Sequence, residues 1–163
     1  MIDARGAAVA GAVGLALLAA APARAAEPAA TPPVTVSILS VQATKEAEPS
    51  CDPALEPIRR ALARSGDYNS FRLLKRESRP ASAGHAVECA MAETYALRVE
   101  AERADKDNVK MCITWVRHEK DKDGTPKTTV LQRIPLTIRN GKYFLSGGWK
   151  LEKGAVLGAV AGE

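Results

Sequence analysis

Hydrophobic and polar residues alternate along much of the chain, with the two-residue period of a half-buried β-strand. The alternation is clearest at 109–116 and 130–138, while residues 34–41 are rich in β-branched side chains. Residues 155–161 carry no charge, which is typical of a strand buried on both sides. The pattern predicts strands at 34–41, 68–77, two within 85–103, 109–116, 130–138, 143–146 and 155–161.

One segment has helical periodicity instead. Three apolar residues recur there at the spacing of a single helical face: Leu55, Ile58 and Leu62. Asp52 is a favourable N-cap residue, and Pro53 suits the first helical position. Pro57 removes a hydrogen bond in the second turn, so the alternative is a later start with Glu56 as N-cap. Either start predicts one amphipathic helix that ends near Ser65.

Residues 85–103 are ambiguous between helix and strand. Their content of Ala, Glu, Leu and Arg favours a helix. Tyr95, Leu97 and Val99, however, alternate with polar or small residues, as in a strand. We therefore predict two strands, with a helix as the alternative.

Turn signals between these runs indicate how the strands connect. Asn140-Gly141 is the strongest hairpin signal in the chain, because both residues tolerate positive φ. Pro135 cannot donate a hydrogen bond to a neighbouring strand, so it places 130–138 at a sheet edge or a bulge. Short connections give antiparallel neighbours. The predicted fold is therefore mainly β (α+β), an antiparallel β-sandwich or half-open barrel of about seven or eight strands with one amphipathic helix.

The first 33 residues have a different composition from the rest. Residues 6–21 are uncharged and are followed by Ala23-Arg24-Ala25, which is typical of a secretory signal peptide cleaved after Ala25. The alternative is an uncleaved membrane anchor, but the run is shorter than the roughly 20 residues that a spanning helix needs. We predict a signal peptide at 1–25, a flexible linker at 26–33, a single β-rich domain at 34–163, and export to the periplasm or the extracellular space.

Four short motifs stand out along the chain: Asp52-Pro53-x-Leu55, Ser70-Phe71-x-Leu73-Leu74, Gly147-Gly148 and Gly154-x-x-Leu157. With these motifs the chain resembles small secreted bacterial β-rich proteins of unknown function. The motifs span most of residues 34–162 and are structural in character. The three cysteines depart from the pattern of this group. The resemblance implies no activity and no site residues.

The chain has three cysteines, an odd number, so at least one thiol has no partner within the chain. Export favours disulfides, and three single pairings are available. Cys89 and Cys112 both fall in predicted strands, and we favour their pairing. Cys51 lies beside the predicted helix start, where a helix dipole could stabilise a thiolate.

Residues suited to catalysis or metal binding are few. His85 and His118 are the only histidines, and the sequence contains no familiar nucleophile or phosphate-binding motif. A Cys/His pair drawn from Cys51 or Cys89 would make a thiol enzyme or hydrolase, which is the alternative function. The acidic residues at 119–124 alternate like the start of a calcium loop, but the final bidentate acid is missing. We expect a charged turn there, no metal and no cofactor.

Binding surfaces are the remaining candidates. Arg59, Arg60 and Arg64 form a basic helix face in a chain of net charge +4. Trp149 follows two glycines and could contact a glycan or a partner. We therefore predict an exported, noncatalytic bacterial envelope protein that binds a protein, or an anionic glycan or lipid surface, but not nucleic acid. A sheet edge is a further candidate surface, and a subunit of an envelope complex is a further alternative.

Mass spectrometry of the exported protein tests the predicted cleavage. We expect the intact mass to correspond to a chain that begins at Ala26, because small residues at 23 and 25 suit the peptidase. Alkylation with and without reductant then counts the free thiols. An exported chain that retains Met1 would contradict the predicted signal peptide.

Overall fold

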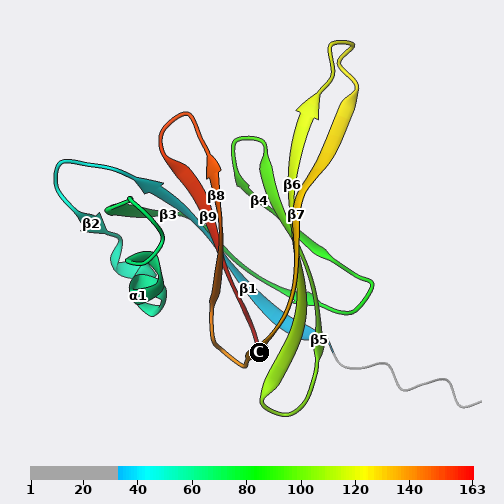
Figure 1. Ribbon diagram of the computed structural model, residues 1–163. Helices are drawn as coiled ribbons and strands as arrows, with labels where there is room; N and C mark the ends of the chain where they lie inside the picture. Colours follow the sequence, from blue (N-terminus) through cyan, green and yellow to red (C-terminus); the bar gives the residue numbers. More distant parts are fainter. Residues whose placement is uncertain (1–32) are drawn as a thin grey trace, which may run out of the picture.

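The computed structural model describes residues 33–163, which form two stacked β-sheets with a helical segment against the outer face of the first (Figure 1). The first sheet has the strand order β2 (Ser50–Cys51), β3 (Ser70–Ala81), β1 (Val34–Thr44), β9 (Ala155–Gly162) and β8 (Phe144–Lys150). The second sheet has the order β4 (Val87–Ala92), β5 (Tyr95–Arg103), β6 (Asn108–Lys120) and β7 (Pro126–Arg139). The predicted signal peptide, and the linker apart from Pro33, lie outside the described residues.

All neighbouring strands are antiparallel except the short β2, which pairs in parallel with β3. The predicted mainly β fold with one amphipathic helical segment is therefore confirmed. Apolar side chains from the facing sides of the two sheets form the larger core cluster. Such packing of two antiparallel sheets is the arrangement of a β-sandwich.

The helical segment begins as the sequence predicts. The Asp52 side chain accepts a hydrogen bond from the backbone N–H of Ala54 at 2.9 Å, and Pro53 opens the segment. A 3-10 helix η1 (Pro53–Ile58) containing Pro57 leads into the short helix α1 (Arg59–Leu62). Leu55, Ile58 and Leu62 are buried against the outer face of the first sheet in a second core cluster. Within residues 33–163, no helix is long and apolar enough to cross a membrane.

Strand β9 lies between the two core clusters, and all of its eight residues are buried. Side chains of Val156 and Val160 enter the cluster between the sheets, while Leu157 and Ala159 enter the cluster beneath the helical segment. A strand covered on both faces needs apolar or small residues at every position. This explains why its sequence carries no charge.

The segment 85–103 forms two strands, as predicted, rather than a helix. β4 and β5 pair antiparallel, with Val87 opposite Val99 and Ala92 opposite Tyr95. Glu93 in the connecting turn has a φ of 49°, a left-handed conformation uncommon outside glycine. The alternating apolar residues thus outweighed the helical propensity of the segment.

The turn at Asn140-Gly141 differs from the expectation. It connects β7 of the second sheet to β8 of the first, so the strands that flank it do not pair. Gly141 does adopt the expected positive φ, at 68°. The turn carries the chain from one sheet of the sandwich to the other. The residues of a turn alone therefore do not determine which strands become neighbours.

Trp115 of β6 joins the two sheets. Its side chain is completely buried, and its indole Nε1 donates a hydrogen bond to Ser146 Oγ of β8 at 3.0 Å. The ring lies against the bare backbone of Gly147 and Gly158, where an added Cβ would come within 2.8 and 2.9 Å of Trp115 Cζ2. Because these two residues of the first sheet have no side chains, the sheet leaves the space that the indole fills.

We expect Gly158→Ala to destabilise the protein by about 1–3 kcal/mol, the usual cost of overpacking a core. In a Trp115→Phe background the smaller ring leaves room, so the same substitution should cost about 1 kcal/mol less. Urea unfolding of the wild type, both single variants and the double variant measures this coupling. Additive costs would show that Gly158 does not serve to accommodate Trp115.

Candidate functional site

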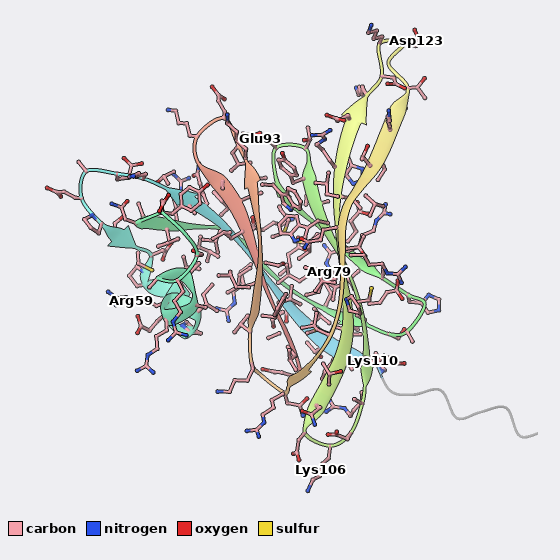
Figure 2. The ribbon with its side chains drawn as sticks, in the orientation of Figure 1. Arg59, Arg79, Glu93, Lys106, Lys110 and Asp123 are labelled. Carbon is pink, nitrogen blue, oxygen red and sulfur yellow. The ribbon has the colours of Figure 1, made fainter. Side chains whose placement is uncertain are left out.

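The three predicted arginines are exposed on the helical segment, but they do not form one site. Arg59 Nη1 lies 3.3 Å from Glu56 Oε2. The Arg59 side chain also lines a small cavity of about 210 Å³, together with Cys51. Arg64 lines a different groove, on the side facing β8. Arg60 is exposed beside them. Figure 2 shows Arg59 extending from the helical segment into solvent.

The groove beside Arg64 runs between the end of α1 and strand β8 and has a volume of about 560 Å³. Ala61, Arg64 and Ser65 form its helical side. The other side is formed by residues 143–148 together with Leu157 of β9. The groove therefore places one cation next to the edge of the first sheet.

Among the described strands, β8 is the last of the first sheet and pairs only with β9. Proteins commonly protect such edges with charges, prolines or bulges. β7 carries Pro126 and Pro135, β3 carries Pro80 and several charges, and β4 carries Glu88. Residues 144–149 of β8 contain neither charge nor proline, and a bulge between Gly147 and Trp149 is the protection that they show. The one charge of β8 is Lys150 at its end, so residues 144–149 form an uncharged, proline-free stretch of sheet edge.

Trp149 belongs to the same strand but is not a free surface residue. It is half-buried and packs edge-to-face against Trp115, with ring centroids 6.3 Å apart and an interplanar angle of 65°. Its indole Nε1 is buried without a hydrogen-bond partner in the described part of the chain. The ring thus contributes to the core between the sheets.

All three cysteines are free thiols in the structure, so the favoured Cys89–Cys112 disulfide is absent. Cys89 points into the core between the sheets, whereas Cys112 lies on the outer face of the second sheet. Strand β5 also lies between β4 and β6, which carry the two residues. A disulfide requires Cβ atoms about 4 Å apart, and opposite faces of a sheet with an intervening strand do not provide this.

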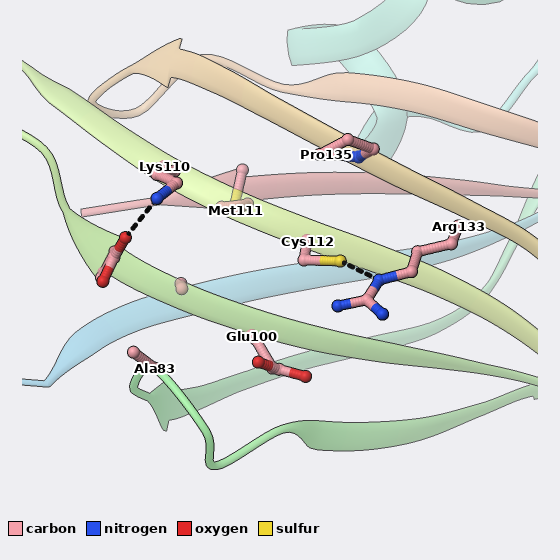
Figure 3. A pocket seen from close by; sticks show the side chains of 9 residues that line it. Ala83, Glu100, Lys110, Met111, Cys112, Arg133 and Pro135 are labelled. Atoms are coloured by element: carbon pink, nitrogen blue, oxygen red, sulfur yellow. Dashed lines mark hydrogen bonds and ion pairs between the residues drawn. The ribbon is translucent and has the colours of Figure 1, made fainter.

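The three thiols differ in environment. Burial raises the pKa of Cys89 to about 11, and burial also raises the pKa of Cys51. Cys112 is half-buried and accepts a hydrogen bond from Arg133 Nε at 3.0 Å, which Figure 3 shows. Cys112 is the one described cysteine with a cationic hydrogen-bond donor at its sulfur.

The two histidines do not pair with the cysteines. No hydrogen bond joins a cysteine sulfur to an imidazole within residues 33–163, so the expected Cys/His pair gains no support. His85 lies in an exposed turn, where its backbone N–H bonds to the Ser82 carbonyl. His118 Nδ1 lies 2.9 Å from Thr128 Oγ1, and its Nε2 lies 2.9 Å from Glu88 Oε1.

Glu88 also forms an ion pair with Arg98, so this polar network draws on all four strands of the second sheet. This network could not be predicted from the sequence, because Glu88 and His118 lie 30 residues apart. Side-chain contacts between strands that are separated by a third strand leave no local signal in a sequence.

The acidic run at 119–124 forms a charged turn, as expected. Asp121 and Asp123 lie between β6 and β7, and the Gly124 N–H donates to the Asp121 carbonyl at 2.8 Å. Glu119 pairs with Arg117 instead of facing the aspartates as a ligand. Asp123 marks the tip of this hairpin, which projects beyond the rest of the sandwich (Figure 2).

Acid should weaken the network around Glu88. The hydrogen bond from Arg98, aided by His118, holds the pKa of Glu88 below its usual value. Its stabilising contribution is therefore complete above pH ~4.3, the ordinary pKa of a glutamate, and is lost as pH falls through the lower folded pKa. Because the side chains are exposed, we expect Glu88→Gln to cost less than about 1 kcal/mol at neutral pH.

Urea unfolding at neutral pH and near pH 3 measures this effect. The stability gap between wild type and Glu88→Gln should narrow at the lower pH. The matched control Glu48→Gln, at an exposed glutamate without an ion pair among the described residues, should change little at either pH. A gap at Glu88 that is independent of pH would contradict the assignment.

Comparison of the chain with family models, curated proteins and solved structures finds no match.

Proposed function

We propose that this protein is an exported, noncatalytic envelope module that binds an extended, acidic segment of a partner protein at the edge of β8. The observation that carries the proposal is the uncharged, proline-free stretch 144–149 of edge strand β8, beside the groove that Arg64 lines. An extended peptide that adds to a sheet edge obtains affinity from backbone hydrogen bonds and specificity from neighbouring side chains. Export is supported by the pattern of residues 1–25.

The groove favours a partner segment of a particular kind. The regular part of β8 before its bulge is only about four residues, from Phe144 to Gly147, so the added strand would be short. Arg64 is the charged residue that lines this groove, and it therefore favours a carboxylate on the incoming segment. Tyr95 Oη donates to the Lys150 carbonyl at 3.1 Å, which occupies a backbone acceptor at the far end of β8. Binding would thus centre on residues 143–147.

A panel of synthetic extended peptides, alternating Val and Thr with one central Glu or one central Lys, tests the proposal by fluorescence anisotropy. The processed chain should prefer the Glu peptide. Arg64→Glu should weaken that binding by about tenfold, as expected for reversal of a pairing charge. The matched control Arg60→Glu makes the same charge change on the same segment, away from the groove, and should change affinity by less than about twofold.

Backbone pairing has its own readout. N-methylation of alternate peptide amides should abolish binding in one register and spare it in the other, because only alternate amides of an added antiparallel strand face its neighbour. NMR shift changes should concentrate at residues 143–148. Equal tolerance of both methylation patterns, or shifts centred on β7, would refute the proposal.

A further inference from the structure

The outer face of the second sheet contains a separate pocket of about 420 Å³, within the usual range of small-molecule sites (Figure 3). Strands β5, β6 and β7 supply its base, and Ala83 in the turn between β3 and β4 bounds one side. Cys112 lies in this pocket and faces away from the core. A partly exposed thiol within a ligand-sized cavity is open to a reagent that fits that cavity.

Arg133 gives the Cys112 sulfur a cationic hydrogen-bond donor, which within residues 33–163 the sulfurs of Cys51 and Cys89 do not have. Arg133 Nε donates to Cys112 Sγ at 3.0 Å, and this interaction raises the pKa of Arg133. A guanidinium in direct contact with the sulfur would stabilise the negative charge that the sulfur carries when it reacts. Cys89 is buried in the core, and burial opposes ionisation of Cys51.

The pocket combines charges of both signs around the sulfur. Arg133 and Lys110 provide two cations, while Glu100 and Glu102 provide two carboxylates. Lys110 Nζ lies 2.8 Å from Glu102, and Glu100 accepts a long hydrogen bond of 3.4 Å from the Gly84 N–H. This mixture complements a small ligand that carries both an ammonium and a carboxylate group.

We propose that Cys112 undergoes thiol–disulfide exchange with low-molecular-weight disulfides of the amino-acid type, of which cystine is the simplest, and holds one half as a mixed disulfide in this pocket. The Cys112 thiolate attacks one sulfur of the ligand and forms a new S–S bond. The ligand's own S–S bond breaks, and the other half leaves as a thiolate that takes a proton from water. The ligand disulfide is the oxidant, so the step needs no other reagent.

The charged groups have separate tasks in this exchange. Arg133 stabilises the attacking thiolate and afterwards becomes free to pair with the carboxylate of the bound half. Glu100 on β5 lies near the Arg133 guanidinium in Figure 3, and its carboxylate would attract the ammonium group. A neutral disulfide of similar size would use neither interaction.

The test measures the rate at which each cysteine of the reduced protein becomes modified, by peptide mass mapping after limited exposure to cystine or to neutral hydroxyethyl disulfide. Cys112 should react at least about tenfold faster than Cys51 or Cys89, because Cys89 is buried and the Cys51 sulfur has no cationic hydrogen-bond donor among the described residues. Cystine should react faster than the neutral disulfide at Cys112. Preferential modification of Cys51 or Cys89 would overturn the proposal.

Two variants separate activation from recognition. Arg133→Gln should slow modification of Cys112 by both disulfides about tenfold, while the control Arg76→Gln, at an exposed strand arginine on the other sheet, should not change it. Glu100→Gln should reduce the preference for cystine and leave the rate with the neutral disulfide unchanged. Equal rates with both disulfides in the wild type would overturn the zwitterion site, and an unchanged rate in Arg133→Gln would overturn the activating role.

Discussion

The packing of Trp115 against two glycines is the contact on which the sandwich depends. The indole comes from β6 of the second sheet, while Gly147 and Gly158 belong to β8 and β9 of the first. Protein cores are packed at crystal-like density, so a ring of this size needs matching space on the opposing sheet. The hydrogen bond from Trp115 to Ser146 gives its one polar atom a partner in the core. This one side chain thus contacts β8, β9 and the neighbouring Trp149 at the place where the two sheets meet.

Each sheet is exposed in a different way, which explains why the two candidate sites use different chemistry. The helical segment covers part of the outer face of the first sheet, so β9 is buried on both sides. The open backbone of that sheet therefore lies at its edges, where β8 can pair with another strand. Within residues 33–163 no helical segment covers the outer face of the second sheet, and charged side chains on this face line a pocket around Cys112. One sheet thus offers backbone groups, and the other offers side chains.

Much of this architecture could be predicted from the sequence because local patterns determine it. Leu55, Ile58 and Leu62 occupy one helical face, and alternation separates the strands of 85–103 despite their helical composition. The sheet to which each strand belongs depends on long-range contacts, which is why the Asn140-Gly141 turn joins different sheets. Local alternation did contain one unused signal. Cys89 lies two residues before the buried Met91, so its side chain points to the core face of the second sheet. Cys112 lies between the buried residues Met111 and Ile113, so its side chain points to the outer face.

The pockets themselves could not be predicted, because each combines residues from distant parts of the chain. Arg64 meets β8 only because the helical segment packs over the first sheet, and Arg133 meets Cys112 only through the register of β6 and β7. Cys112 and Trp115 lie on the same strand but point to opposite faces of the sheet. A small group attached at Cys112 would therefore extend away from the core that holds β8. Because neither site needs the other to move, chemistry at Cys112 and strand pairing at β8 can proceed independently.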